Sequence, residues 1–368
     1  MTTSQPPSQV AVEFSLALHN RTGKYVVGRD IIDDARDLIS RVLYWRARRA
    51  QPPTGLEAKV LGRLMSMEID MRLGAAGLAR GAPKLRPPER VLHLDPFTVV
   101  FHRLRPTDII LCHDLGPLTH RSLFTPGVTR LYEHAYAEIA AAQPHMVFVS
   151  QASQAAFHAL YRGPLASSRV IYNALRSEVT RGAGEPVDGI SKPFLLTVGN
   201  VGARKNQLAC VRAFARAGLA QEGCEYVLCG GREPGFEAVA AAAAETPGVR
   251  ILGYVPDAGL NWLYDSAAGF VLPSLLEGFG IPVAEAGARG LVPLVSRDSA
   301  LHEVAGDGAL LADPENEREI ADGMLQLVRM TADEKSNRLA QLRGSIARFD
   351  QATFRNAWRE ALSENAGE

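Results

Sequence analysis

The chain has 368 residues, which is more than one hydrophobic core usually supports, so we expect two domains. Its composition, with 46% hydrophobic and 22% charged residues and a formal net charge of zero, is ordinary for a soluble globular enzyme. No stretch approaches the roughly 20 consecutive apolar residues of a membrane-spanning helix, so we expect no such helix.

The zero net charge hides an asymmetry between the two halves of the chain. Residues 1–185 contain 23 Lys and Arg against 16 Asp and Glu, and residues 186–368 contain 17 against 24, which gives +7 and −7. A basic first half favours an anionic acceptor, a phospholipid-linked substrate or an anionic membrane surface. Alternatively, the opposite charges help two domains to face one another.

The cysteines and the N-terminus indicate a cellular compartment. None of the four cysteines has the spacing of a C-x-x-C or Cys/His metal site, and we expect buried thiols in a reducing compartment at Cys112, Cys210, Cys224 and Cys229. The N-terminus lacks the charged start and apolar core of a signal peptide. We therefore expect a cytoplasmic protein.

The first half of the chain alternates between strand and helix patterns. Residues 10–18 are apolar and predict a first strand, and residues 29–50 have a helical pattern. Three later apolar runs end in polar or turn residues, as parallel strands do: VLHLDP (91–96), DIILCHDL (108–115) and HMVFVS (145–150).

The second half continues this alternation after a linker. Residues 181–193 concentrate Gly and Pro, and we place the domain boundary between 185 and 186. Five strand-like runs follow with helical segments between them, which describes a doubly wound domain with ligands beyond the carboxyl ends of the strands. These runs are PFLLTVG, EYVLCGG, VRILGYV, GFVLPS and LVPLVS. Residues 351–362 form a final amphipathic helix.

The most informative motif is VLPSLLEGFGIPVAEAGARG, residues 271–290. An apolar strand leads into a Gly-Phe-Gly-Ile-Pro loop, and Pro282 fits the first turn of a helix. Backbone N–H groups of the residues from Gly278 to Ile281 can face a phosphate at such a helix start. Glu277 and Glu285 flank the loop, and their carboxylates can accept hydrogen bonds from sugar and ribose hydroxyls.

Two glutamates separated by seven residues resemble the signature of retaining GT-B glycosyltransferases of family four, which includes bacterial polysaccharide mannosyltransferases. Further segments resemble the same family in its order: TVGNVGARKN (197–206), VRILGYVPDAGLNWLYDSA (249–267) and SALHEVAGDGALLADP (299–314). The first half matches more loosely, through RTGKYVVGRDI (21–31), CHDLGPLTH (112–120), FVSQASQAAF (148–157) and VIYNAL (170–175).

The resemblance implies an α/β protein of GT-B fold, with two Rossmann-like doubly wound parallel-sheet domains facing a central cleft. Residues 1–185 would form the acceptor domain and residues 186–350 the nucleotide-sugar domain. Residues 351–368 would form a helix that crosses back to the first domain.

The resemblance also assigns the donor site. Arg204 and Lys205 would hold the pyrophosphate, although they can also be a solvated basic turn. Glu277 would contact the donor sugar and Glu285 the ribose, although Glu285 can also be an acidic residue favoured by the helix dipole. The remaining donor-binding positions are Gly23, Gly199, Asn200, Tyr254, Val255, Gly278, Phe279, Gly280 and Ile281.

In the first half, His113 and Asp114 follow a strand and resemble the family position near the donor sugar or the acceptor hydroxyl. Together with Arg204, Lys205 and Glu277 they are the candidate catalytic residues. Ser150 and Asn173 are candidates for the acceptor side, although Ser150 can also be a helix cap. The Gly-rich loop at Gly23 departs from the family spacing and can be a simple turn.

The function implied is transfer of a hexose from a nucleotide diphosphate sugar to a glycan or lipid-linked acceptor in surface polysaccharide synthesis, with retention. The preferred donor is GDP-mannose. UDP-glucose, UDP-N-acetylglucosamine and deoxysugar nucleotides stay open, as does a non-catalytic nucleotide-sugar-binding subunit. No cofactor and no nucleic acid is expected. No metal is implied, because the acidic residues Glu68 and Asp70 lie within a predicted helix rather than a strand-end loop.

Residues 41–49, RVLYWRARR, place arginines beside Tyr and Trp on the predicted helix. This combination suits a membrane interface, and peripheral attachment to the inner face of the membrane is one interpretation. A solvated helix face with Trp45 in the core is the other.

Overall fold

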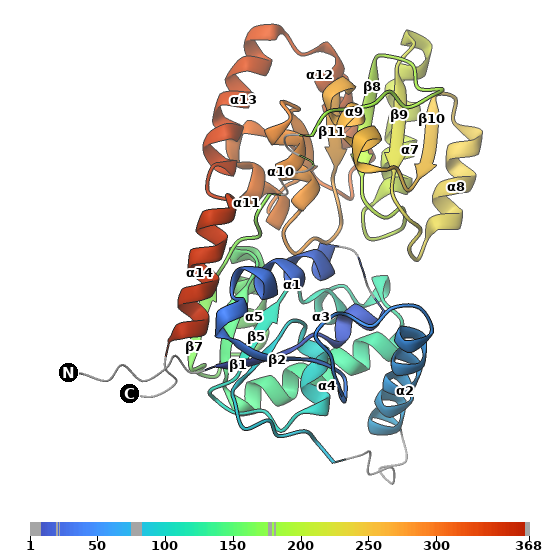
Figure 1. Ribbon diagram of the computed structural model, residues 1–368. Helices are drawn as coiled ribbons and strands as arrows, with labels where there is room; N and C mark the ends of the chain where they lie inside the picture. The colour runs from blue at the N-terminus through green and yellow to red at the C-terminus, as the bar shows by residue number, and fades with distance from the viewer. Residues whose placement is uncertain are drawn as a thin grey trace, which may run out of the picture. The chain divides into compact units, whose positions relative to one another are not determined.

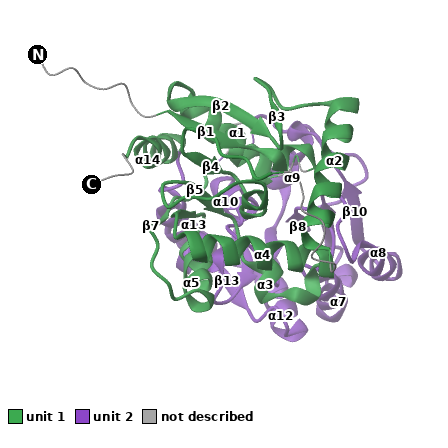
Figure 2. Ribbon diagram, turned by 90° about the horizontal axis from the view of Figure 1, so that it is seen from below, with its two compact units in different colours: residues 1–174, 351–368 green, residues 175–350 purple. Residues whose placement is uncertain are grey.

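The computed structural model describes residues 9–19, 21, 23–74, 83–175, 179 and 182–364 (Figure 1). Their contacts divide the chain into two compact units (Figure 2). Unit 1 comprises residues 1–174 and 351–368, and unit 2 comprises residues 175–350.

Unit 1 is built on a seven-stranded sheet with the strand order β3-β2-β1-β4-β5-β6-β7. All neighbouring strands are parallel except β2 and β3. The strands are β1 (Val10–Glu13), β2 (Ile39–Tyr44), β3 (Ala47–Arg48), β4 (Val91–His93), β5 (Ile109–Cys112), β6 (His145–Phe148) and β7 (Ser167–Val170). The helices are α1 (Gly23–Asp34), α2 (Gly55–Leu73), α3 (Gly116–Thr119), α4 (Pro126–Ala142), α5 (Gln151–Leu160) and α14 (Gln351–Ser363).

The helix expected over residues 29–50 is wrong beyond Asp34. Residues 39–44 form β2, which runs parallel to β1, and the chain then turns at Trp45 (φ 58°) into the antiparallel β3. The run ISRVLY contains β-branched and aromatic residues, which pack well on a pleated surface, and Tyr44 is buried. The arginines of residues 41–49 therefore do not line one face of a helix.

Unit 2 contains an all-parallel sheet with the order β10-β9-β8-β11-β12-β13, the doubly wound arrangement predicted from sequence. Its strands are β8 (Phe194–Val198), β9 (Glu225–Cys229), β10 (Val249–Gly253), β11 (Gly269–Leu272), β12 (Pro293–Ser296) and β13 (Leu310–Ala312). Its helices are α7 (Gln207–Ala217), α8 (Phe236–Glu245), α9 (Asp257–Ser266), α10 (Ile281–Ala288), α11 (Ala300–Ala305), α12 (Glu317–Arg329) and α13 (Ala332–Ile346). The sequence predicted five of these strands and missed β13, which has only three residues.

The boundary between the units falls at 174/175, eleven residues before the predicted position. Backbone carbonyls of the intervening segment accept hydrogen bonds from side chains of unit 2. Arg289 donates to Val179 O and Gly182 O, both at 2.6 Å, and Asn261 donates to Ala183 O at 3.3 Å. These contacts hold the Gly- and Pro-rich segment on unit 2 and move the boundary toward the N-terminus.

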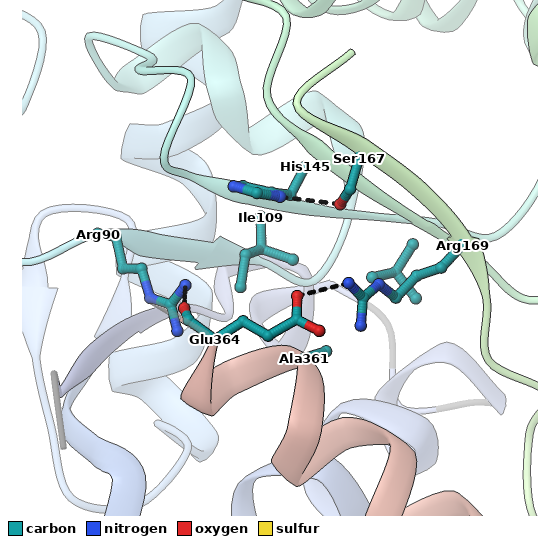
Figure 3. A pocket seen from close by; sticks show the side chains of 8 residues that line it. Arg90, Ile109, His145, Ser167, Arg169, Ala361 and Glu364 are labelled. Carbon is teal, nitrogen blue, oxygen red and sulfur yellow. Dashed lines mark hydrogen bonds and ion pairs between the residues drawn. The ribbon is translucent and has the colours of Figure 1, made fainter. Parts of the chain in front are cut away.

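Helix α14 belongs to unit 1 although it ends the chain. Its Phe354 and Trp358 are buried, and Arg359 pairs with Asp37 at 2.6 Å. At its C-terminal end Arg90 donates to the backbone oxygen of Leu362, and it also donates to the backbone oxygen of Glu364 at 2.8 Å (Figure 3). The end of the chain thus completes the unit that the first 174 residues begin.

The four cysteines are buried and reduced, as predicted. Burial raises the pKa of the Cys224 and Cys229 thiols to about 11. None of the helices in the described part of the chain is long and apolar enough to cross a membrane.

Candidate functional site

In unit 2, the loops that follow β8 and β11 bring together the residues predicted for a donor pyrophosphate. Parallel strands place the loops at their carboxyl ends along one edge of the sheet. Gly199 follows β8 directly with φ 133°, a conformation that favours glycine. A Cβ atom at this position would lie 2.5 Å from Lys205 Cε. The glycine therefore leaves the space in which the Lys205 side chain crosses the loop.

Arg204, Lys205 and Glu277 form one ion-paired cluster. Lys205 Nζ lies 2.5 Å from Glu277 Oε1, and an Arg204 guanidinium nitrogen lies 3.3 Å from the same oxygen. Arg204 also pairs with Glu233 at 3.4 Å and donates to Leu276 O at 3.2 Å. The Lys205 side chain is only 7% exposed, so solvent screens this cluster weakly.

The electrostatics of the cluster keep Glu277 ionised. Burial by itself would raise the pKa of Glu277, but the charges of Lys205 and Arg204 lower that pKa to about 2. Glu277 thus forms ion pairs with Arg204 and Lys205, the two cations that we assigned to a pyrophosphate from the sequence. An incoming diphosphate can replace the carboxylate on Lys205 and Arg204, which releases Glu277 to accept a hydrogen bond from a sugar hydroxyl.

Asn206 joins the two loops, and sequence reasoning missed it. Asn206 adopts a left-handed conformation (φ 60°), and its side-chain amide donates to Pro273 O at 3.1 Å and Pro314 O at 2.6 Å. Leu275 N donates to Arg204 O at 3.0 Å. Because Asn adopts this conformation more readily than most residues, its place directly after Arg-Lys at a loop end was an available signal. Glu233, the second carboxylate on Arg204, had no local signal.

The GFGIP segment forms the predicted loop and helix start. Gly280 (φ 100°) is the N-cap of α10, which begins at Ile281, and Pro282 lies in the first turn. A Cβ atom at Gly280 would overlap the side chain of Leu301. The Phe279 ring is buried and packs edge-to-face on Phe349, with ring centroids 5.0 Å apart. Phe279 thus anchors the loop, and Gly278 lies between this anchor and Glu277.

The other donor-side candidates differ in exposure. Glu285 is completely buried within α10, and its Oε2 accepts a hydrogen bond from the Tyr264 hydroxyl at 3.1 Å. Tyr254 follows β10 and is 83% exposed, with Val255 partly buried beside it. Asn200 lies in the loop after β8, where its carbonyl accepts from the Gln207 amide at 3.0 Å. The ribose role of Glu285 stays a prediction, because its carboxylate is covered in this structure.

Unit 1 carries a second polar cluster, where β4 and β5 end. It contains the predicted His113 and Asp114 together with Lys24, Asp95 and Tyr132. Lys24 Nζ lies 3.1 Å from Asp95 Oδ2 and 3.7 Å from Asp114 Oδ2. The Tyr132 hydroxyl donates to Asp95 Oδ1 at 2.7 Å.

The surroundings of His113 fix both its tautomer and its charge. Its Nε2 lies 3.0 Å from Leu94 O, and because a carbonyl only accepts, Nε2 carries the proton and Nδ1 the lone pair. Burial, followed by the charge of Lys24, lowers the pKa of His113 to about 4. The imidazole is therefore neutral at neutral pH and offers Nδ1 as an acceptor.

Sequence reasoning missed Lys24, Asp95 and Tyr132. Burial by itself would lower the pKa of Lys24, but the charge of Asp95 holds that pKa well above its usual value. Lys24 follows Gly23, the first residue of α1, so the candidate loop supplies a cation as well as its glycine. The lysine lay within the quoted motif RTGKY, whereas Asp95 and Tyr132 are brought to it by the fold.

The acceptor-side candidates have local roles. Ser150 is the N-cap of α5, where its hydroxyl accepts from Ser153 N at 3.0 Å, in agreement with the helix-cap alternative. Ser153 in turn donates to His113 O at 3.2 Å and ties this cap to the unit 1 cluster. Asn173 is buried, and its Oδ1 has no hydrogen-bond partner among the described residues.

Acidic residues outside these clusters do not gather into a metal site. Within the described ranges, no group of three or more His, Cys, Asp or Glu side chains is arranged to hold a metal ion. Glu68 lies on α2 as predicted, and there it pairs with Arg46 at 2.7 Å and Arg72 at 2.5 Å.

Comparison with known proteins supports the resemblance read from the motifs. Residues 188–342 match the family model described as glycosyl transferases group 1. O-antigen chain mannosyltransferase B of Escherichia coli is 37% identical over 115 residues, which are 31% of this chain and 29% of that protein. The serotype-specific mannosyltransferase WbdA of Escherichia coli is 29% identical over 252 residues, 62% of this chain and 30% of that protein. The matches thus span less than a third of either relative.

Solved structures show the fold. Anabaena Alr3699/HepE in complex with UDP-glucose aligns with a TM-score of 0.69 at 17% identity, covering 96% of this chain and 99% of that chain. WaaG, a glycosyltransferase involved in lipopolysaccharide biosynthesis, aligns with a TM-score of 0.67 at 12% identity, covering 97% and 100%. The expected GT-B fold class, with two parallel-sheet α/β domains, is confirmed.

Proposed function

Because residues 188–342 carry the group 1 glycosyl transferase domain, we propose that this chain is a glycosyltransferase of surface polysaccharide synthesis. It moves a hexose from a nucleotide diphosphate sugar to a glycan or lipid-linked acceptor. The observation that carries the proposal is the cluster of Arg204, Lys205 and Glu277 at the carboxyl ends of β8 and β11, inside the matched domain.

The reaction needs stabilisation of a departing diphosphate, because negative charge accumulates on it as the glycosidic bond breaks. Arg204 presents a planar fork to phosphate oxygens, and Lys205 presents a point charge. The α10 N-terminus at Gly280 adds backbone N–H groups and the positive end of a helix dipole. As the diphosphate takes the two cations, Glu277 becomes available to orient the sugar.

For the stereochemistry we infer retention through a same-face displacement. The bond between the anomeric carbon and the diphosphate oxygen breaks while the acceptor oxygen bonds to the same face of that carbon. The acceptor proton passes to the departing phosphate, which Arg204 and Lys205 hold in place. Within unit 1 we separately infer that His113 Nδ1 and Asp114 accept hydrogen bonds from hydroxyl groups of a saccharide. The proposal requires neither a metal nor a cofactor.

For the donor we propose GDP-mannose. The support is that the curated relatives include an O-antigen chain mannosyltransferase and WbdA, which is named a mannosyltransferase. UDP-glucose is the second candidate, because HepE was solved with that ligand. The acceptor is a saccharide carried on a glycan chain or a lipid, at the inner face of a membrane.

Two measurements test the donor. Because a ligand stabilises the folded state according to the logarithm of its concentration over its dissociation constant, a thermal-shift panel of GDP-mannose, UDP-glucose and UDP-N-acetylglucosamine ranks the candidates. GDP-mannose should give the largest shift and should be hydrolysed slowly without acceptor. A shift without hydrolysis or transfer would identify a nucleotide-sugar-binding subunit instead of an enzyme.

The assignment of Lys205 is tested by Lys205→Ala. Losing one charge-assisted contact to the leaving group costs about 2–4 kcal/mol in transition-state stabilisation, so turnover should fall about a hundredfold or more. The matched control is Lys335→Ala on α13, which should leave turnover unchanged. Turnover of Lys205→Ala within about threefold of the parent would overturn the role of this residue.

A further inference from the structure

Most of the large hydrophobic side chains that are exposed in the described part of the chain gather on one helix of unit 1. Seven such side chains are exposed in the described part of the chain, and five of them lie on α2. Their exposed fractions run from 43% to 78%. These five residues, here called the α2 stripe, are Leu56, Val60, Leu64, Met67 and Met71.

The α2 stripe occupies a single face of the helix. Its members are spaced by four, four, three and four residues, the spacing that aligns side chains along one side of an α-helix. The opposite side, with Gly62, Met65 and Glu68, is buried against unit 1. Figure 1 shows α2 at the edge of unit 1. A surface helix normally presents polar residues to solvent, whereas α2 presents apolar residues. A contiguous exposed apolar face of this kind indicates an interaction surface.

Basic side chains lie beside the stripe. Lys59 and Arg63 are exposed on the same side of α2, and neither has a hydrogen-bond or ion-pair partner among the described residues. At the start of the helix, Arg49 pairs with Glu57 at 2.8 Å, which neutralises that acid. Asp70 is the remaining exposed acid of this face. The two unpaired cations outnumber it.

The charge of the whole unit has the same sign. Counted over the sequence of unit 1, 23 Lys and Arg stand against 17 Asp and Glu, a net charge of +6. Unit 2 contains 17 against 23, a net charge of −6. A positive unit is attracted to an anionic surface over distances up to about the Debye length of 8–10 Å.

We propose that the α2 stripe docks on an anionic lipid bilayer, with its apolar side chains at the acyl boundary and Lys59 and Arg63 at the head groups. A second copy of the chain fits less well. Antiparallel pairing of two stripes about their centre brings the two Arg63 side chains together, and parallel pairing places Lys59 and Arg63 opposite themselves. Anionic lipid neutralises these cations, whereas a symmetric dimer concentrates them.

This docking deepens the proposed function, because a lipid-linked acceptor would lie at the same membrane surface. The biological role of the docking rests on the proposed function, whereas the binding of α2 to lipid does not. From the sequence we considered residues 41–49 as the membrane contact. Arg46 of that segment pairs with Glu68 at 2.7 Å, and we place the membrane contact on the α2 stripe instead.

Co-sedimentation with vesicles tests the docking without any turnover. The parent protein is incubated with phosphatidylcholine vesicles and with vesicles that contain phosphatidylglycerol as well. It should bind the anionic vesicles about tenfold or more tightly than the neutral ones, and salt should weaken this preference. Equal binding to both, or no binding to either, overturns the proposal.

Two variants assign the binding to α2. Leu64→Gln with Met67→Gln removes apolar contacts, and Lys59→Glu with Arg63→Glu reverses the flanking charge. Each should lower anionic-vesicle binding by about tenfold or more. The matched control is Leu160→Gln with Arg162→Glu on and just after α5, which changes one exposed apolar and one exposed basic residue elsewhere in unit 1. The control should bind like the parent.

Folding and donor binding are followed separately by circular dichroism and by the thermal shift with GDP-mannose. Both should stay as in the parent for all three variants, so a failure of docking is distinguished from a failure of the proposed function. Stripe variants that still bind overturn the proposal. So does sedimentation that shows a dimer in the parent and a monomer in the Leu64→Gln/Met67→Gln variant without any effect of lipid.

Discussion

At the scale of single residues, Glu277 has two successive partners in the proposed reaction. In the structure it binds Lys205 and Arg204, and in the reaction it contacts the donor sugar. The same carboxylate therefore competes with the diphosphate for the cations before it orients the substrate. This competition predicts opposite effects of one substitution on binding and on turnover.

We expect Glu277→Gln to bind the free nucleoside diphosphate about fivefold to tenfold more tightly, because on the order of 1 kcal/mol of ion-pair competition is removed. Its turnover should fall, since the amide cannot replace the carboxylate toward the sugar. Isothermal titration with GDP and a steady-state assay measure the two effects. Weaker GDP binding in Glu277→Gln would contradict the competition.

The depressed pKa of His113 predicts a pH dependence of stability. The folded protein binds this proton only near pH 4, whereas the unfolded chain binds it near pH 6.5. The unfolded state therefore holds more protons between these values, and stability falls as the pH drops through this window. The slope is about 1.4 kcal/mol per pH unit for one group. Burial also lowers the pKa of His93 well below its usual value, which adds to the loss in the same direction.

Urea denaturation at pH 7, 6 and 5 measures this slope. The variant His113→Gln removes the group and should show a shallower loss of unfolding free energy on acidification than the parent. His120→Gln changes an exposed histidine and serves as the control with the parent slope. An unchanged slope in His113→Gln would mean that another group takes up the proton.

At the scale of elements, the C-terminal end of α14 depends on one buried arginine. Arg90 donates to Leu362 O in the last turn of this helix and to the backbone oxygen of Glu364 just after it. Arg169 pairs with the exposed Glu364 carboxylate (Figure 3). Helix carbonyls without intrahelical partners are stabilised by such donors.

Arg90→Met retains an apolar stem and removes the donors, so the buried Leu362 O and the partly buried Glu364 O lose their partners. We expect a loss of about 1–3 kcal/mol in the free energy of unfolding. Arg169→Met removes a largely solvated ion pair and should cost less than about 1 kcal/mol. Chemical denaturation compares the two variants, and equal losses would show that Arg90 stabilises no more than a surface pair does.

At the scale of the whole molecule, unit 1 is built from both ends of the sequence. Contacts of α14 with the C-terminal end of α1 include Gln351 to Asp34 at 2.7 Å and Arg355 to Asp34 at 2.9 Å. The buried Trp358 adds apolar area that the rest of unit 1 would otherwise expose. Unit 1 therefore cannot complete its packing without α14.

A chain ending at Asp350 should consequently lose stability in unit 1 more than in unit 2. Limited proteolysis followed by mass spectrometry should find new cleavage sites within residues 9–174 and few within residues 182–350. A chain ending at Glu364 keeps all the contacts of α14 described above and is the control. Equal susceptibility of both units in the shorter chain would contradict this dependence.

The sequence by itself determined much of unit 2 and of its site. Buried parallel strands are apolar runs in the sequence, and local backbone geometry dictates a glycine or proline in a loop. The loops after β8 and β11 could therefore be predicted from the sequence. Glu277, Arg204 and Lys205 lay within such loops, and their mutual contact followed from the shared sheet edge. Their ion pairing to one another, instead of an open anion site, was not readable.

Only the tertiary structure decided the rest, because it depends on groups far apart in the chain. Residues 39–44 contain β-branched and aromatic residues that suit a strand, but only their parallel pairing with β1 decided between strand and helix. Asp95 and Tyr132 reached Lys24 through the packing of α4 and the ends of the sheet. The burial of Glu285 and the exposure of the α2 stripe were likewise set by neighbours distant in sequence. Local chemistry specifies loops and strands, whereas long-range packing decides which side chains meet and which remain at the surface.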